Sequence, residues 1–425
     1  MTATQTAPRV RVLAPLREFM RNESAGGALL VLATIAALVW ANSPWKAAYA
    51  SVWHTDFALT LGRYTLEMDL HHWINDGLMT IFFFVVGMEI KREATSGHLA
   101  SRQQLMLPLV SALGGMVVPA LLYLAIAAGD APKGWGVPMA TDIALATGLL
   151  SIMASRVSAG ARVFLLGLAV VDDIGAIIVI ALFYSSGVSG WVLLVAILAV
   201  LSVLVLQRLN VQYVPVYILA GVTAWFCLLQ AGVHPTLAGV ATGLMTPLTP
   251  LNVSGVVRGR ETESGDIVAT NEQVTVLEWF EHHLAPWASF FIVPVFALAN
   301  AGIEISTTSI SDALSSRVAW GIVAGLFIGK PVGVLIATKI ATRTGIAQMP
   351  KGAGGVTLWG VGHAAGIGFT VALFVSELAF EDEILRADAK MAILFASIAS
   401  ALVALVVLSR APKSTSKNAT SIPAH

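Results

Sequence analysis

Two adjacent aspartates, Asp172 and Asp173, lie near the middle of an apolar segment that runs from Phe164 to Tyr184. The segment is long enough to cross a lipid bilayer, which takes about 20 predominantly apolar residues. A carboxylate at the centre of a bilayer costs about 2.5–3.5 kcal/mol on insertion scales, so acids at that depth usually have a function. Packing alone explains two such acids poorly. The pair therefore predicts a site for a cation, a proton, or both.

The composition is that of a membrane protein with many spans. The 425 residues are 56% hydrophobic and only 12% charged, whereas soluble domains have about 25% charged residues. The formal net charge of zero gives no indication of a nucleic-acid partner. The single cysteine, Cys227, excludes an intramolecular disulfide. Residues 1–21 are polar and basic and do not resemble a signal peptide.

Apolar segments recur along the chain, and we expect an all-α membrane protein with about twelve transmembrane helices. The expected spans are residues 25–42, 73–90, 105–128, 137–154, 163–184, 191–206, 213–230, 232–247, 286–302, 318–338, 356–379 and 391–409.

The remaining segments divide the chain around one transmembrane domain, residues 25–410. Residues 1–24 form an expected cytoplasmic N-terminal segment, and 411–425 an expected disordered cytoplasmic tail. Residues 43–72 contain alternating apolar and polar positions around a Gly-Arg pair, which predicts a β-hairpin outside the membrane. Residues 248–285 are polar and charged and predict a cytoplasmic loop between two halves of the domain.

The distribution of Lys and Arg predicts the orientation. These residues are about three times as frequent at the termini and even-numbered connections as at the odd-numbered ones. The bias places both termini in the cytoplasm, which requires an even number of spans.

Two of the spans are interrupted. Pro138 and the polar pair Thr141 and Asp142 stand early in one of them, and residues 360–370 contain four glycines in the other. Non-helical backbone at membrane depth survives only where protein or a water-filled cavity satisfies its hydrogen bonds. Interrupted spans in both halves predict two discontinuous helices that cross at the midplane around a transporter binding site. In the alternative reading, the glycines only allow close helix packing.

Lys330 is a further charge within an apolar segment. A buried ammonium needs a carboxylate partner or loses its proton, and the candidates are Asp142, Asp172 and Asp173. Neighbouring side chains on a helix diverge by about 100°, so only one of the adjacent pair can face Lys330 well. A purely structural ion pair is the alternative, although three acids against one base leave an excess of negative charge.

The chain resembles the NhaA-type sodium/proton antiporters in motifs spread over about residues 15 to 410. The matching segments are Gly87–Glu93, Ala140–Ala144, Val171–Ile177, Gly232–Gly239, Pro294–Gly302, Ile328–Pro331 and Gly366–Thr370. Discontinuous helices are characteristic of this family, so the interrupted spans and the resemblance are not independent observations.

The resemblance implies a secondary transporter of the bacterial-type cytoplasmic (inner) membrane that exchanges sodium or lithium for protons. It implies that Asp173 is the principal cation ligand and that Asp172 is the partner of Lys330 and a second sodium ligand. Asp142, with Thr141 beside it, would balance the partial charges of the crossed broken helices. A homodimer is also implied, and no cofactor or enzymatic activity is expected.

The resemblance further connects Glu89, Glu93, His234 and Glu281 with a response to pH, and Asp76 also fits a family motif. Each has a simpler explanation. Glu89 and Glu93 are one helical turn apart in a charged cluster that could simply be solvated. His234 could cap the helix that follows it, and Glu281 could open a helix and favour its N-terminus.

The acids suggest how exchange would work. Sodium and protons would compete for the same carboxylate oxygens, so the site holds one or the other. Release of a second proton when the Lys330–Asp172 pair breaks would make exchange electrogenic. A cation channel and, less favoured, an intramembrane aspartyl protease are the alternatives. The Gly-x-Gly-Asp motif of such proteases is absent from the sequence. The expected hairpin offers a free strand edge for dimerisation.

Overall fold

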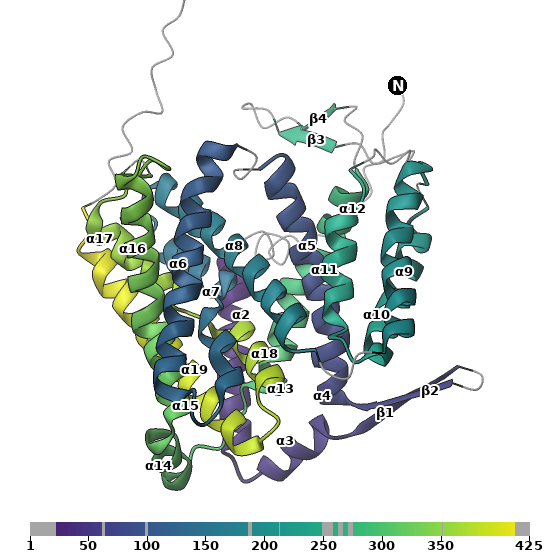
Figure 1. Cartoon of the computed structure of the whole chain (residues 1–425), viewed down its shortest axis with the longest axis horizontal. Coiled ribbons are helices and arrows are strands. Elements are labelled where there is room, and N and C mark those ends of the chain that lie inside the picture. Colours follow the sequence, from purple (N-terminus) through teal and green to yellow (C-terminus); the bar gives the residue numbers. More distant parts are fainter. Residues whose placement is uncertain are drawn as a thin grey trace, which may run out of the picture.

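Helices make up nearly all of the described structure (Figure 1). The computed structural model describes residues 23–61, 64–97, 101–185, 189–211, 213–248, 258–261, 267–270, 275–350 and 352–412. Most of the expected N-terminal segment, much of the loop within 248–285, and nearly all of the expected tail lie outside these residues. The mainly helical fold expected from the composition is confirmed.

The helices of the first half are α2 (Glu23–Ala41), α3 (Lys46–Trp53), α4 (Leu70–His72), α5 (Met79–Thr95), α6 (Arg102–Ala127), α7 (Ile143–Ile152), α8 (Ala159–Phe183), α9 (Gly190–Arg208), α10 (Val214–Ala231) and α11 (Thr236–Met245). Those of the second half are α12 (Val276–Trp287), α13 (Val293–Asn300), α14 (Thr307–Ser315), α15 (Arg317–Val323), α16 (Lys330–Arg343), α17 (Gly355–Ala365), α18 (Phe369–Ala379) and α19 (Glu383–Ser409). The 3₁₀ segment η2 (Pro132–Met139) and the π-helical turns η1 (Trp73–Leu78), η3 (Ala288–Ile292) and η4 (Ala324–Gly329) join some of them.

Each of the expected spans overlaps a helical segment. Within the described ranges, nine helices are long and apolar enough to cross a membrane, or up to eleven if two bent pairs each form one span. One bent pair is α2 with α3, and the other is α17 with α18, which meet at 44°. The remaining expected span corresponds to α11, which has only 10 residues and is about 15 Å long. It covers only about half of a bilayer core.

The β-hairpin expected between the first two spans is present. Strand β1 (Asp56–Leu61) pairs antiparallel with β2 (Tyr64–Asp69), and Leu61 is opposite Tyr64. The hairpin projects from one end of the helical bundle (Figure 1), which we call the hairpin face. A second, shorter hairpin of β3 (Arg258–Glu261) and β4 (Ile267–Thr270) lies at the opposite end, the loop face. The sequence did not predict this second hairpin.

Polar side chains define several helix starts. Ser158 caps α8 by accepting a hydrogen bond from Ala161 N. At α12, Thr275 and Glu278 form a reciprocal capping box. The expectation that Glu281 opens a helix is therefore wrong, because α12 begins at Val276 and Glu281 lies inside it.

Helices α5 and α11 pack through glycines, and we call their contact the glycine seam. A Cβ atom on Gly87 would lie 2.7 Å from the carbonyl oxygen of Val240. Gly239 and Gly243 meet the carbonyl oxygens of Thr80 and Phe84 in the same way. Small residues allow such close backbone approach between membrane helices, and here they hold the short α11 against a full-length span.

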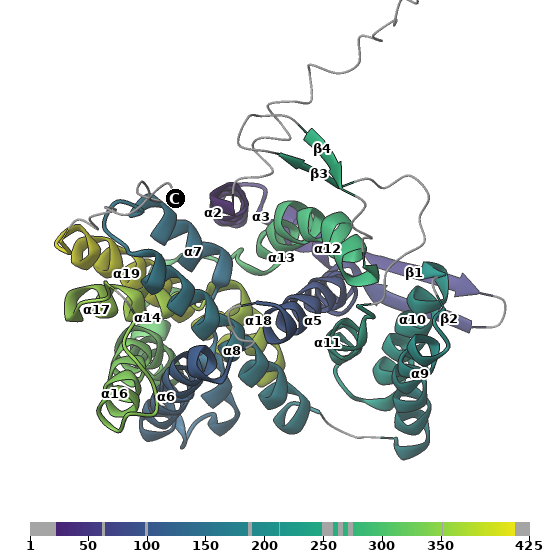
Figure 2. The same cartoon turned by 90° about the horizontal axis from the view of Figure 1, so that it is seen from above.

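The half-helix α18 of the second interrupted span lies inside the bundle, whereas α9 and α10 pack on each other at its edge (Figure 2). Side-chain burial along α8 agrees with a central position for the middle of that helix. Asp172 and Asp173 of α8 are 0% and 4% exposed, while Leu182 and Phe183 near the end of the same helix are largely exposed.

Candidate functional site

The two breaks in the helices lie against each other. In the first, η2 ends at Met139 and α7 begins at Ile143. In the second, α17 ends at Ala365 and α18 begins at Phe369. The backbone N–H of Asp142 donates to the carbonyl of Ile367 over 2.6 Å, so each break satisfies part of the other's backbone. The expected crossing of two discontinuous helices is thus formed through their non-helical residues.

The carboxylate of Asp142 caps two helices at once. Its Oδ1 accepts from Leu145 N of α7 over 3.0 Å. Its Oδ2 accepts from Thr370 N of α18 over 3.0 Å and from the Thr370 hydroxyl over 2.6 Å. A helix N-terminus carries a partial positive charge of about half an electron. One buried negative charge therefore complements the N-terminal ends of both α7 and α18.

Donors from side chains complement the opposite, C-terminal ends of the broken segments. Lys330 Nζ donates to the carbonyl of Met139, the last residue of η2. The Thr141 hydroxyl lies 2.9 Å from the carbonyl oxygen of Ala365, the last residue of α17. The four helix ends at the crossing thus have polar partners of the sign that their dipoles favour.

Lys330 pairs with Asp172, one of the three acids considered as its partner. Its Nζ is 2.7 Å from Asp172 Oδ2, and both side chains are completely buried. The Thr141 hydroxyl also lies 2.8 Å from Asp172 Oδ2. Because a hydroxyl has one hydrogen to donate, it cannot fully satisfy both Asp172 and Ala365.

Asp173 is also buried but has a different environment. Its electrostatic neighbours are Asp172, Glu89, Asp142 and Lys330, so acids outnumber bases around it. Among the described residues, the Oδ1 atoms of both Asp172 and Asp173 are buried without a hydrogen-bond partner. Leaving a buried acceptor unsatisfied costs about 1–3 kcal/mol, more for a charged group. A cation or protons would remove that cost, so the donor set fits either.

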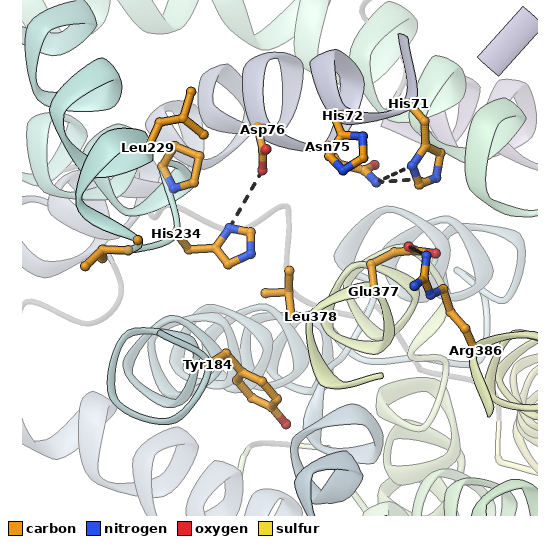
Figure 3. A pocket seen from close by; sticks show the side chains of 13 residues that line it. His71, His72, Asn75, Asp76, Tyr184, Leu229, His234, Glu377, Leu378 and Arg386 are labelled. Atoms are coloured by element: carbon orange, nitrogen blue, oxygen red, sulfur yellow. Dashed lines mark hydrogen bonds and ion pairs between the residues drawn. The ribbon is translucent and has the colours of Figure 1, made fainter. Parts of the chain in front are cut away.

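The four residues connected with pH response do not form one cluster. Glu281 of α12 pairs with Arg92, which stands between Glu89 and Glu93 in sequence and belongs to the last turn of α5. That end of α5 lies toward the loop face (Figure 1). His234 lies at the hairpin face instead, where its Nδ1 is 3.9 Å from the Asp76 carboxylate (Figure 3).

His234 does not cap the following helix with its side chain. The N-cap position of α11 is Pro235, and no side-chain hydrogen bond is made there. The His234 ring packs edge-on against Phe374 of α18 at a centroid distance of 5.7 Å. Within the described structure, its Nδ1 has no hydrogen-bond partner.

The contact between Thr370 and Asp142 at the crossing was not predicted from the sequence. Thr370 stands in the Gly366–Thr370 motif, but nothing in the sequence assigned it a partner. Its hydrogen bonds to Asp142 connect positions 228 residues apart. The available signal was a hydroxyl directly after the second break, in the first turn of a half-helix whose N-cap Gly368 has no side chain to offer.

Comparisons with known proteins agree along nearly the whole chain. A family model described as Na+/H+ antiporter 1 matches residues 17–408. The Na(+)/H(+) antiporter NhaA 2 of Myxococcus xanthus is 47% identical over 416 residues, which cover 92% of this chain and 88% of that protein. The protein of the same name from Sorangium cellulosum is 44% identical, covering 93% of this chain and 90% of the relative. The Na(+)/H(+) antiporter NhaA of Oleidesulfovibrio alaskensis is 44% identical, with 92% of each chain covered.

Proposed function

This chain belongs to the NhaA family of sodium/proton antiporters and exchanges sodium for protons across a membrane, and we propose that Asp173, Asp172, Asp142, Thr141 and Lys330 form its exchange site. We call these five residues the aspartate cluster. The observation that carries the proposal is the pair of buried, unpartnered carboxylate oxygens on Asp172 and Asp173.

Sodium would bind mainly to Asp173, with Asp172 and the Thr141 hydroxyl as further oxygen ligands. Hard cations prefer carboxylate, hydroxyl and carbonyl oxygens, as Ca²⁺ and Mg²⁺ sites illustrate. Lithium, a smaller cation of the same charge, would use the same ligands. Asp142 would stay outside the ligand set, because both of its oxygens already hold helix N-termini.

Protons would replace sodium on the same carboxylates, so the two cargoes take turns. Sodium at Asp172 would draw that carboxylate away from Lys330, which would then lose the partner that stabilises its charge. Lys330 would then release a proton in addition to the proton that sodium displaces from the carboxylates. More than one proton would move for each sodium ion, which makes the exchange electrogenic. Proton flux that does not change when a voltage is imposed on vesicles would reject that stoichiometry.

All five residues of the aspartate cluster are buried, which favours gated exchange over an open channel. Asp172 faces an ammonium and not a second catalytic carboxylate, which argues against the aspartyl protease. Alternating exposure of the cluster to the two faces would complete the transport cycle.

The pH response would involve two separate places. The Arg92–Glu281 pair links α5 to α12 near Glu89 and Glu93, so a change at this ion pair would reach both helices. His234 would act at the hairpin face, beside Asp76. Neutralising Glu281 should therefore change the pH dependence of exchange more than the affinity of the protein for sodium. An unchanged pH profile would exclude Glu281 from the pH response.

The distribution of basic residues supports an orientation with both termini and the loop face in the cytoplasm and the hairpin face outside. The alternation of apolar and polar segments supports the division into residues 1–24, 25–410 and 411–425, and membership of the family supports placement in a bacterial-type inner membrane. Labelling of single cysteines at the two faces in intact cells tests this orientation. Reaction at loop-face positions alone would contradict it.

Two subunits would associate through the hairpin. The sheet has two strands, and apolar Phe57 and Leu59 on β1 are about half exposed, at 49% and 50%. Exposed strand edges readily add a strand from another chain.

The substitution Asp173→Asn tests the exchange site. It keeps the size of the side chain but removes the charge, so sodium-driven proton movement in membrane vesicles should fall to background across the pH range. Asp388→Asn is the matched control, because Asp388 is also a buried aspartate in a long apolar helix but lies on α19, outside the aspartate cluster. Exchange at the wild-type rate in the Asp173 variant would refute the assignment.

A further inference from the structure

Charged side chains hold the half-helix α18 at both of its ends. At the N-terminal end, Thr370 donates to the carboxylate of Asp142. At the other end, the α18 residue Glu377 forms ion pairs with Arg386 and Lys390 of α19. The mechanism proposed above uses the first contact and gives no role to the second.

The second contact is an ion triad around a buried glutamate, whose two basic partners are partly exposed. Lys390 Nζ is 2.6 Å from Glu377 Oε1, and Arg386 Nη1 is 3.2 Å from Glu377 Oε2. The Glu377 side chain is only 7% exposed. Removing one partner from such a buried pair leaves an uncompensated charge, which makes the contact costly to break.

Arg386 also binds the backbone at the end of α18. Its Nε donates to the carbonyl of Phe380 over 3.2 Å, and its Nη2 donates to the carbonyl of Glu381 over 3.1 Å. Phe380 is the C-cap residue of α18. A cation at a helix C-terminus complements the helix dipole, so α18 has an anion at its N-terminus and a cation at its C-terminus.

The triad borders a cavity of about 360 Å³ at the hairpin face, and both Glu377 and Arg386 line it (Figure 3). The opposite wall contains His71 and Asn75, where His71 Nε2 is 3.0 Å from Asn300 of α13. Both ion pairs of Glu377 run to α19, on its own side of the cavity. A change in the width of this cavity would therefore move α18 and α19 together.

We propose that Glu377 is a positioning residue for exchange, which joins α18 to α19 so that Thr370 stays in place on Asp142 while the cavity opens and closes. The proposal rests on the exchange site at the aspartate cluster. Thr370 and Glu377 are on one continuous helix, about 10 Å apart along its axis. A tilt of the outer end of α18 therefore displaces the inner end, where α18 meets the aspartate cluster.

The test compares Glu377→Gln, Glu377→Asp and wild-type protein in two measurements. The first is sodium-driven proton flux in liposomes, and the second is proton release from detergent-solubilised protein when sodium is added. Glu304→Gln is the matched control, because Glu304 forms an exposed ion pair with Lys46, away from α18 and α19.

In Glu377→Gln, the maximal flux should fall on the order of tenfold or more, while sodium-triggered proton release persists. The sodium concentration for half-maximal flux should change by less than about twofold, since the carboxylate ligands are intact. Glu377→Asp should recover part of the flux, and Glu304→Gln should match the wild type.

Wild-type flux in Glu377→Gln would overturn the positioning role, and so would loss of proton release together with flux. Failure of wild-type protein to release protons on sodium addition would instead refute the exchange site itself. Should Glu377→Gln not fold, Arg386→Lys replaces it, because lysine keeps the charge but cannot reproduce the fork onto Phe380 and Glu381. Flux at the wild-type rate in Arg386→Lys would then overturn the proposal.

Discussion

At the scale of single residues, the hydroxyl of Thr370 contributes a hydrogen bond to a buried carboxylate at the crossing. Thr370→Val keeps the shape of the side chain and removes this donor, so Asp142 loses one of its three hydrogen bonds. We expect a loss of about 1.5–3 kcal/mol in the free energy of unfolding, as for other hydrogen bonds to charged groups. Thermal unfolding of the purified protein in detergent measures it.

Thr34→Val is the control for that substitution. Thr34 is also buried, but its hydroxyl donates to the neutral carbonyl of Leu30 within its own helix. The expected loss is smaller, about 1 kcal/mol. Equal losses in the two variants would show that the Thr370–Asp142 bond has no special weight.

Lys330 and Asp172 should show strong coupling in a double-mutant cycle. Lys330→Met leaves Asp172 as a buried charge without its partner and should cost about 3–5 kcal/mol of stability. Adding Asp172→Asn removes that charge, so the double variant should regain much of the loss. Unfolding transitions of the four proteins in one detergent measure the coupling, and strictly additive costs would contradict it.

The sequence was sufficient to find the charged residues at the crossing but not all of their contacts. Asp172 and Lys330 were predictable because a charge within an apolar segment needs a partner of the opposite sign. The capping of two helices by Asp142 was not, because it depends on a contact between segments 228 positions apart. The position of His234 beside Asp76 and far from Glu281 was not predictable either, because it depends on which end of α11 lies at the hairpin face.

At the scale of elements, the start of the span after the hairpin depends on Asp69. Its side chain accepts from the backbone N–H of His72 and caps α4. Burial raises the pKa of Asp69, but the two hydrogen bonds and the charge of His72 outweigh it, so the pKa lies below its ordinary value. The ionised carboxylate therefore stabilises the folded protein.

The sign of that pKa shift predicts how the stability changes with pH. Because the pKa is lower in the folded than in the unfolded chain, the stabilisation is complete above pH of about 4 and disappears as the pH falls through the folded value. Asp69→Asn keeps a capping side chain without the charge. Its melting temperature should lie below that of the wild type at pH 7 and converge with it under acid conditions. A constant difference down to pH 3 would exclude the charge as the cause.

Long apolar elements were predicted well because their composition alone determines where they can lie. Helix α8 and the β1–β2 hairpin follow the apolar run and the alternating pattern seen in the sequence. Element ends were predicted less well. The short α11 could not be distinguished from a full span, because the apolar segment 232–247 extends beyond both ends of the helix.

At the scale of the whole molecule, the hairpin should determine the oligomeric state. Asp56 and Asp69 are opposite each other in the register, so a short linker can replace residues 57–68 without displacing the bundle. We expect the shortened protein to be monomeric in detergent, by light scattering coupled to size-exclusion chromatography. Deletion of residues 258–270 at the opposite face is the control and should leave a dimer. A dimer in both deletions would place the interface elsewhere.

The glycine seam between α5 and α11 also affects how genetic screens of this protein should be read. A methyl group added at Gly87, Gly239 or Gly243 would collide with the backbone of the facing helix, so growth of cells on high salt should fail for nearly every replacement there. A selection scored by survival alone would rank these glycines with Asp173. The amount of protein recovered from the membrane separates the two classes, because a replaced aspartate leaves a folded but inactive protein, whereas a replaced glycine reduces its abundance.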